Sequence, residues 1–219
     1  MIPTIFCWTK FGVEAGQNVT TIFERKEQER QANKGVFLWG IGNAVLPSIV
    51  ELVRDVSSPE VLFSPIVTRP RAVDVSPKAV VAWRAGVTPD GAIWEIPDSH
   101  LCTSGIGCAI PRRAHYALVC SSDESLLTQS ADEQVFPSTL KNFVSGNPLG
   151  ASQVTAVVAL DRISTPSGRG YEVTIRGRLV RPFCVQLMDP VFVPPGYVGS
   201  SRQSIWQPVE KSQPTLFTE

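Results

Sequence analysis

The sequence predicts an α+β protein built on a mixed, mostly antiparallel sheet. Six to eight short runs are rich in β-branched and aromatic residues, which favour strands. Two or three stretches have helical character, and they come early in the chain. The last third holds long strand runs joined by turns, which is typical of antiparallel hairpins. These observations favour a sheet that curls and carries helices on part of its surface.

The bulk composition is that of one elaborated domain. The chain has 219 residues, 43% of them hydrophobic, which is ample for one core. Acidic and basic residues balance at 20 each, so no overall charge attracts nucleic acid or membrane. We expect a single domain over residues 1–197 and a polar tail over residues 198–219. Nothing in the sequence indicates an oligomeric state.

The cysteines indicate reduced thiols in the cytoplasm. They number 5, no two are spaced as CxxC, and only 2 histidines accompany them. We therefore expect neither a metal site nor a cofactor. No apolar stretch approaches the roughly 20 residues that span a bilayer, so no membrane contact is expected either. The cysteines are Cys7, Cys102, Cys108, Cys120 and Cys184.

The first third alternates predicted strands and helices. Two apolar runs, IPTIFCW and GVFLWGIGN, flank a charged helix whose N-cap is Asn18 or Thr20. The last two turns of this helix carry so much charge that we expect them to be solvated. Pro47 suits the first turn of a second helix. The elements expected here are a strand over 2–8, a helix over 18–33, a strand over 36–41 and a helix over 44–54.

The rest of the chain is expected to be mainly extended. Thr88-Pro89-Asp90-Gly91 is a strong turn signal, and it is predicted to join two apolar runs into a hairpin. The segment 97–113 is irregular and rich in Ser, Gly and Pro. The strands expected in this part are 79–84, 92–96, 116–120, 153–160 and 171–180, the last with period-two alternation.

The last third resembles a known family. VTAVVALDRIST followed by YEVTIRGRLVRPFCVQL is similar to the closing hairpin of PUA-like barrels, including the EVE and ASCH domains. At the other end, FCWTKFG, a helix and then GVFLWGIGN follow the same order as in those folds. The resemblance spans residues 4–66 and 153–193. It implies a sheet curled into a PUA-like barrel, with residues 70–150 as a central insertion.

PUA-like domains read nucleic acids, often through a modified base held in an aromatic-walled pocket. Glycines at the end of the second strand would let a flat ligand approach the backbone, an indole would stack on it, and an amide would read its edge. The base-binding residues that the resemblance implies are Trp8, Trp39, Gly40, Gly42 and Asn43, with Lys10 beside Trp8.

Each of these residues also has a structural interpretation. Trp39 alternates with Phe37 along one strand, a pattern typical of a buried core position. Gly40 and Gly42 suit a β-bulge at the strand end. Asn43 suits the N-cap of the helix that follows. The sequence leaves both interpretations open.

A further resemblance, one of class and not of aligned residues, is to bacterial anti-phage DNA glycosylases that remove glucosylated hydroxymethylcytosine. Cleavage of a glycosidic bond needs a carboxylate beside an oxocarbenium-like transition state. Glu14 and Asp74 are the candidate carboxylates, and Lys10 is a third candidate catalytic residue. The alternative for Lys10 and Glu14 is a surface salt bridge of little energetic worth.

Arginines crowd the hairpin of the last third. Arg176 and Arg178 share one face of a strand by alternation, which would make a stripe that contacts phosphates. The alternative is a solvated outer face. The phosphate-binding candidates are Arg162, Arg169, Arg176 and Arg178, with Arg181 beside them.

The function expected from the sequence is binding of DNA through a flipped, modified base, with excision of that base as a DNA glycosylase in anti-phage defence. The expected partner is DNA with a modified cytosine. One alternative is a non-catalytic reader that uses the same pocket. Another is a small-molecule amidohydrolase on the same fold, with Lys10 and Glu14 as base and acid.

Overall fold

A computed structural model describes the strands and helices that make up the body of the protein. The predicted catalytic residues Glu14 and Asp74 lie outside the described residues, and so does the side chain of Asn43. The described residues are 2–12, 18–66, 75–76, 79–82, 110–111, 116–129, 133–150, 153–188, 197–198 and 207–208.

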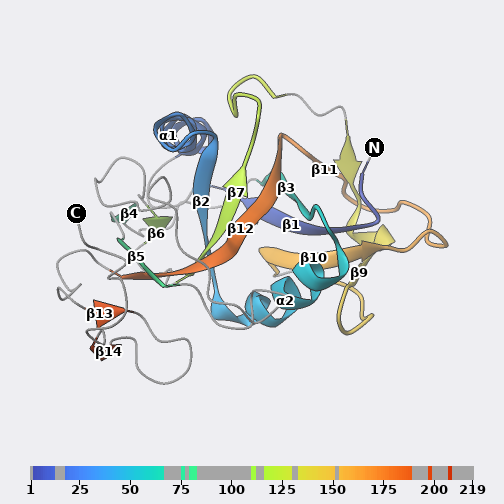
Figure 1. Ribbon diagram of the computed structural model, residues 1–219. Coiled ribbons are helices and arrows are strands. Elements are labelled where there is room, and N and C mark those ends of the chain that lie inside the picture. Colours follow the sequence, from blue (N-terminus) through green and yellow to red (C-terminus); the bar gives the residue numbers. More distant parts are fainter. Residues whose placement is uncertain are drawn as a thin grey trace.

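One mixed sheet runs through the molecule (Figure 1). Its strands follow the order β2-β7-β12-β3-β1-β10-β9, and β5 pairs with β12 beside this path. Among the described pairs of this sheet, β1 and β3 are parallel and the others are antiparallel. The α+β class and the mixed sheet are therefore confirmed. The bounds are β1 Ile5–Phe11, β2 Val36–Ile41, β3 Glu60–Pro65, β5 Ala79–Ala82, β7 Tyr116–Ser121, β9 Leu140–Asn142, β10 Thr155–Leu160 and β12 Ile175–Met188.

The sheet curls, but it is not closed into a barrel. Its path ends at β2 on one side and at β9 on the other, and no described strand joins these two ends. The curl is nevertheless strong, because Trp39 on β2 reaches across the inner face to other strands. Its ring centroid lies 4.7 Å from that of Phe63 on β3 and 5.4 Å from that of Phe11 on β1. The inner face therefore encloses the larger hydrophobic core.

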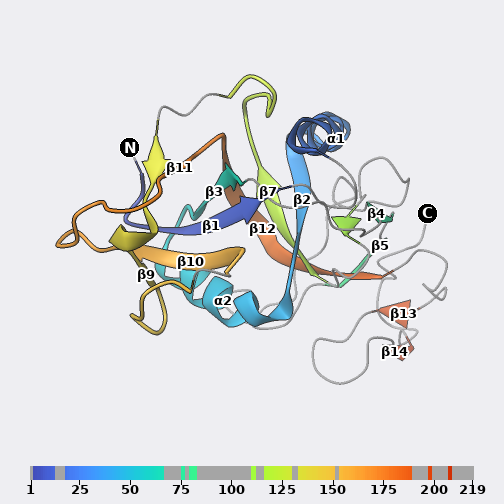
Figure 2. The same ribbon diagram turned by 180° about the vertical axis from the view of Figure 1, so that it is seen from behind.

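Helix α2, Leu46–Asp55, covers part of this inner core. Its buried residues Ile49, Leu52 and Val53 recur at helical spacing and contribute to the core. The helix contacts β1 and β10, and it lies beside β10 in both views (Figures 1 and 2). Pro47 occupies the first turn, as the sequence predicts, where a missing N–H costs nothing.

Helix α1, Val19–Ala32, packs against the free edge of β2 and is seen nearly end-on beside one end of that strand in Figure 1. Asn18 is its N-cap, and its side chain accepts a hydrogen bond from the Thr21 N–H at 2.8 Å. The predicted exposure of its last two turns is wrong, because Lys26 and Glu29 are buried there. The carboxylate of Glu29 accepts the Leu38 N–H at 2.7 Å, while the Lys26 amine donates to the Leu38 carbonyl.

This buried ion pair takes the place of a neighbouring strand. The Lys26 amine and the Glu29 carboxylate are 2.6 Å apart, so each charge is compensated by the other. Together they satisfy the N–H and the C=O that β2 would otherwise leave unpaired at its edge. The last two turns of α1 have little apolar surface, and these hydrogen bonds therefore anchor the helix to the sheet.

A smaller hydrophobic cluster covers the outer face of the sheet. It is built from alternate residues of β1, β3 and β10, together with a short pair of strands that packs over them. That pair is β8, Gln134–Val135, and β11, Tyr171–Glu172. The cluster consists of Phe6, Trp8, Leu62, Val135, Leu140, Ala156, Val158 and Val173.

The segment 70–150, expected as an insertion, supplies strands to the main sheet. β7 lies between β2 and β12, and β9 pairs with β10. The physical reason is the run Ala117–Cys120, whose residues are buried throughout and therefore need covered surfaces on both faces. The other described pieces are β4, Val75–Ser76, with β6, Ile110–Pro111, and β13, Tyr197–Val198, with β14, Gln207–Pro208.

The described cysteines are Cys7, Cys120 and Cys184, and all three are buried. Burial raises the pKa of the Cys7 thiol to about 12, which keeps it protonated and unreactive. No helix among the described residues is long and apolar enough to cross a membrane.

Candidate functional site

The two indoles predicted to wall one pocket lie on opposite faces of the sheet. Trp8 pairs across with Leu62 and packs in the outer cluster. Trp39 belongs to the inner core, where Phe11 and Phe63 contact its ring, and only 8% of it is exposed. The structure therefore does not bring these two tryptophans together, and Trp39 has the core role that the sequence left open.

Gly40 and Gly42 line neither of the two cavities described below. Gly40 lies within β2, opposite Ala117. Gly42 follows the strand, and a Cβ placed on it would meet nothing within 4 Å, so no close contact with described atoms demands glycine there. Asn43 begins a 3-10 turn, η1 Asn43–Val45, and the N-cap position of α2 is Val45. Asn43 is therefore not the N-cap of α2.

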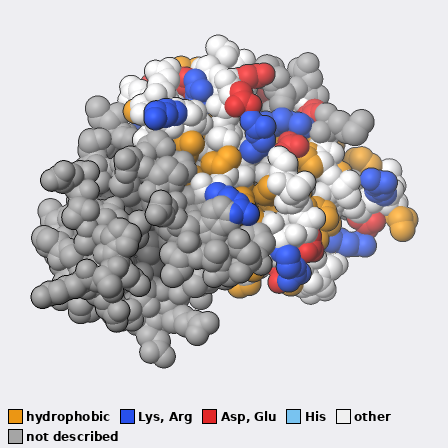
Figure 3. Space-filling view, viewed as in Figure 1, with side chains coloured by type: hydrophobic (Ala, Val, Ile, Leu, Met, Phe, Trp, Pro, Cys, Tyr) orange, Lys and Arg blue, Asp and Glu red, His pale blue; other side chains and the backbone are white. Residues whose placement is uncertain are grey.

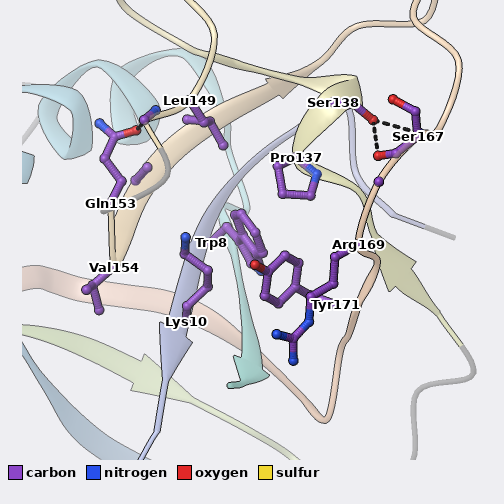
Figure 4. A pocket seen from close by; sticks show the side chains of 13 residues that line it. Trp8, Lys10, Pro137, Ser138, Leu149, Gln153, Val154, Ser167, Arg169 and Tyr171 are labelled. Atoms are coloured by element: carbon purple, nitrogen blue, oxygen red, sulfur yellow. Dashed lines mark hydrogen bonds between the residues drawn. The ribbon is translucent and has the colours of Figure 1, made fainter. Parts of the chain in front are cut away.

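Trp8 and Lys10 line a cavity on the outer face, with a volume of about 320 Å³ (Figure 4). The end of β1 forms one side of it. The other sides come from η3, Pro137–Thr139, from the chain before β10 and from the loop that leads into β11. The lining residues are Trp8, Lys10, Pro137, Ser138, Leu149, Gly150, Gln153, Val154, Ala156, Ser167, Gly168, Arg169 and Tyr171.

Two aromatic rings form the back of this cavity. The ring centroids of Trp8 and Tyr171 are 5.4 Å apart, and the rings meet edge to face at 72°. The indole N–H of Trp8 donates to the Ser64 hydroxyl at 3.0 Å, which fixes the indole and satisfies its one polar atom. Trp8 is 2% exposed, whereas Tyr171 is half-buried. Tyr171 therefore offers more ring surface to a ligand than Trp8.

Two cations lie against these rings. The Lys10 amine is 5.3 Å from the ring centroid of Trp8 and 5.7 Å from that of Tyr171. The Arg169 guanidinium carbon is 5.2 Å from the Tyr171 centroid. Lys10 is 8% exposed and Arg169 is exposed. Burial lowers the pKa of the Lys10 amine.

The charge around the cavity is of one sign. Lys10 and Arg169 are both positive, and none of the described residues that line the cavity is Asp or Glu. Apolar side chains fill much of the remaining wall, so positive charge is held beside surface of low polarity. Such surroundings suit a ligand that combines a flat ring with a negative group.

Hydrogen bonds hold the rim of the cavity in place. The Ser167 N–H donates to the Ser138 hydroxyl, which in turn donates to the Ser167 carbonyl, each at 2.9 Å (Figure 4). Gly170 follows, and a Cβ there would lie 2.9 Å from the ring of Phe136. A larger residue here would require the side chains of Phe136 and Gln134 to shift, so glycine suits this position beside Arg169.

The other arginines predicted to bind phosphate lie elsewhere. Arg176 and Arg178 line a second outer cavity of about 330 Å³. Arg176 pairs with Glu60 at 3.4 Å and also with Glu133, and Arg178 pairs with Asp123. Figure 3 shows cations and carboxylates side by side over the described part of one face. The lining of this second cavity is Glu60, Ser121, Ser122, Asp123, Glu124, Gln129, Arg176, Gly177 and Arg178.

Arg162 also lies apart from the aromatic cavity. It is exposed in the turn after β10, and its guanidinium donates to the Thr4 hydroxyl at 3.2 Å. Of the four arginines predicted to contact phosphate, Arg169 is the one that lines the cavity with Trp8. Predicted residues that the structure brings together are thus Trp8, Lys10 and Arg169.

Sequence reasoning missed Tyr171, the ring that contacts both cations. The signal was present, because Tyr171 is the aromatic that leads the predicted strand after an Arg-Gly step. Nothing local in the sequence shows that this residue would pack against Trp8, however, since 163 positions separate the two in the chain. The wall residues Leu149 and Gln153 carry no motif at all.

No group of three or more His, Cys, Asp or Glu side chains that could hold a metal ion occurs among the described residues. Comparisons with known proteins were also negative: no family model, no curated protein and no solved structure matches this chain. The geometry of the aromatic cavity is therefore the basis for assigning a function.

Proposed function

We propose that the protein binds nucleic acid by taking one nucleobase into the cavity formed by Trp8, Lys10 and Tyr171. The observation that carries this proposal is the pairing of aromatic walls with two cations and no carboxylate among the described lining residues. A nucleotide has the matching parts, a flat ring joined to an anionic phosphate.

The cavity has the size that such a ligand needs. Its volume of about 320 Å³ lies near the lower end of ligand pockets, roughly 300–1,000 Å³. A base that stacks on Tyr171 would gain about 1–3 kcal/mol. Arg169 is exposed at the mouth, and its planar fork suits a phosphate of the strand outside.

The resemblance to PUA-like domains supports the same assignment. It implies a base pocket at the end of the first strand, with Trp8 and Lys10 as members, and both residues line the cavity. We accordingly propose that the curled, open sheet is a divergent PUA-like fold. Trp39 and Gly42 are left out of the proposed site, because neither lines the cavity at Trp8.

The proposed ligand is DNA that carries a modified cytosine, and the proposed role is that of a reader. Excision of the base needs a carboxylate at the sugar. Glu14 and Asp74 could supply it only from outside the described residues, so glycosylase activity in anti-phage defence stays a prediction from the sequence.

The test compares duplexes that differ in one base. Fluorescence anisotropy would measure binding of matched oligonucleotides with cytosine, hydroxymethylcytosine or glucosylated hydroxymethylcytosine at one position. We expect binding of a modified duplex to exceed that of the cytosine duplex about tenfold, as one good contact in a pocket provides. Equal affinity for all three duplexes would contradict a pocket that reads the base.

The same samples separate a reader from a glycosylase. Alkali breaks a DNA strand wherever a base has been removed, so the products can be read on a denaturing gel. Binding with intact strands supports the reader, and strand breaks support excision. If no duplex is bound or cleaved, the small-molecule amidohydrolase becomes the better interpretation.

A further inference from the structure

The second outer cavity presents charges of both signs on one surface. Its floor is β12 at Gly177, where a Cβ would point into the inner core and lie 3.6 Å from the rings of Phe37 and Phe63. Side chains alternate along a strand, so Arg176 and Arg178 face outward from this floor. A partner of one charge sign, such as a DNA strand, would meet like charges here. The carboxylates of the lining are Glu60, Asp123 and Glu124.

Asp123 lies at the rim of this cavity on a segment that is held in place. Its side chain is 82% exposed, whereas the preceding Ser122 is buried. The Ser122 N–H donates to the Gly35 carbonyl at 3.0 Å, and the Ser122 hydroxyl donates to the Glu124 carbonyl at 2.9 Å. Asp123 is therefore presented in a defined position, and little backbone freedom is lost when it binds a partner.

Asp123 and Arg178 use only part of their hydrogen-bonding capacity on each other. The Nη2 of Arg178 donates to the Oδ2 of Asp123. Within the described part of the chain, neither the guanidinium nor the carboxylate makes a further hydrogen bond. A guanidinium has five N–H donors and a carboxylate has two acceptor oxygens, so each group can bind a second partner without breaking the first contact.

We propose that this surface binds a second copy of the chain in a two-fold symmetric contact. Asp123 of each copy enters the cavity of the other copy and accepts hydrogen bonds from the partner's Arg178. A two-fold axis makes both contacts at once, so four side chains form a closed ring of alternating charge. The chain has 20 acidic and 20 basic residues, and no net charge keeps two copies apart.

The ring gives more than the pair within one chain can give. An isolated exposed ion pair contributes little, whereas several charges in a network contribute more. The same segment carries Leu127, which is 52% exposed and adds apolar surface to the contact. Small interfaces are weak and transient, so we expect a dimer with a Kd on the order of 10–100 µM. The contact needs no DNA, so this proposal goes beyond the proposed function and does not depend on it.

Analytical ultracentrifugation of charge-reversal variants tests the contact. Arg178→Glu and Asp123→Arg each place like charges across both halves of the contact, so each variant alone should dimerise about 100-fold more weakly than the wild type. An equimolar mixture should dimerise again, because the introduced carboxylate of one chain then meets the introduced guanidinium of the other. Mixing cannot repair a charge clash within one chain, so this rescue identifies a contact between copies.

The chain offers matched controls for net charge. Arg54 and Glu51 also form an exposed pair, on α2, and neither residue lines either cavity. Arg54→Glu and Glu51→Arg change the net charge by the same amounts and should dimerise as the wild type does, singly and mixed. Circular dichroism would check the fold of every variant. If a charge reversal does not fold, Asp123→Asn and Arg178→Gln should still weaken the dimer about tenfold.

Three results would each overturn the proposal. The first is a wild type that stays monomeric up to about 1 mM. The second is a dimer that survives both Arg178→Glu and Asp123→Arg, since the contact would then lie on another surface. The third is a mixture of these two folded variants that contains no more dimer than the mixture of the two control variants.

Discussion

The two outer cavities have nearly the same volume, about 320 and 330 Å³, but one is lined by charges of one sign and the other by charges of both signs. The described lining of the first holds Lys10 and Arg169 and no carboxylate. The second holds Arg176 and Arg178 together with Glu60, Asp123 and Glu124. An arginine is therefore a poor marker of an anion site unless the carboxylates that the fold brings to it are known.

The largest expected effect is loss of the ring at the aromatic cavity. Tyr171→Ala should weaken binding of a modified duplex roughly 10- to 100-fold, because stacking contributes about 1–3 kcal/mol per base. Tyr171→Phe keeps the ring and should bind nearly as wild type does. Anisotropy titrations would measure both. Equal binding by Tyr171→Ala and the wild type would remove the functional distinction between the two cavities.

The next largest effect is expected from loss of Arg169, the cation at the mouth of the aromatic cavity. Arg169→Gln should weaken DNA binding about fivefold and lower the slope of log affinity against log salt by about 0.9, one phosphate contact in a duplex. Arg162→Gln and Arg178→Gln remove the same charge at positions outside the aromatic cavity, and both should leave the slope unchanged. A lower slope in Arg178→Gln would place DNA at the second cavity as well.

Removal of carboxylates from the second cavity should give it a gain of DNA binding. Glu60→Gln with Asp123→Asn keeps the shape of the second cavity but removes partners of Arg176 and Arg178. We expect a gain of a few-fold in affinity for unmodified DNA, with a steeper salt dependence. Glu51→Gln with Asp55→Asn is the matched control, since both carboxylates pair with Arg54 on α2 and neither lines either cavity. An equal gain in that control would show an effect of net charge alone.

The smallest expected effect is a local response to acid. The pKa of Glu27 is lowered to about 2, and the largest cause is its hydrogen bonds from Arg30. The Glu27 carboxylate also accepts the Leu126 N–H at 2.9 Å. A carboxylate with a lowered folded pKa stabilises the fold fully above its unfolded value of 4.5, and this contribution is lost as pH falls toward 2. As pH falls, the segment around Leu126, beside the second cavity, should therefore loosen before the strands around the aromatic cavity do.

Hydrogen exchange would measure this difference. The protection factor of the Leu126 amide should fall a few-fold between pH 5 and pH 3, while that of the Lys10 amide should stay constant. Glu27→Gln should make the protection of Leu126 independent of pH in this range. A parallel fall at both amides would indicate global and not local loosening.

Much of the local structure followed from the sequence. The strands at residues 5–11, 36–41, 116–121 and 155–160 lie close to the runs that predicted them, because β-branched and aromatic residues favour a pleated, buried backbone. Helix α1 was also predicted, but its burial was not. Its burial depends on Lys26 and Glu29 finding the edge of β2, and this contact leaves no hydrophobic periodicity to read.

The candidate site was only half predictable. Trp8, Lys10 and Arg169 were selected for their chemistry and do meet at one cavity. Trp39 was selected for the same chemistry, yet it lies in the core on the other face. Side chains alternate between the two faces of a sheet, so the face depends on register, and register depends on which strands become neighbours.

The sequence by itself determined the α+β class, the early helices, the buried strands and the residue types available for binding a base. These properties depend on backbone preference and on hydrophobic spacing over a few residues. Only the tertiary structure decided that Tyr171 meets Trp8 and that Arg178 meets Asp123. Such contacts join residues far apart in the chain, and their energies arise only when the folded sheet brings the side chains within reach.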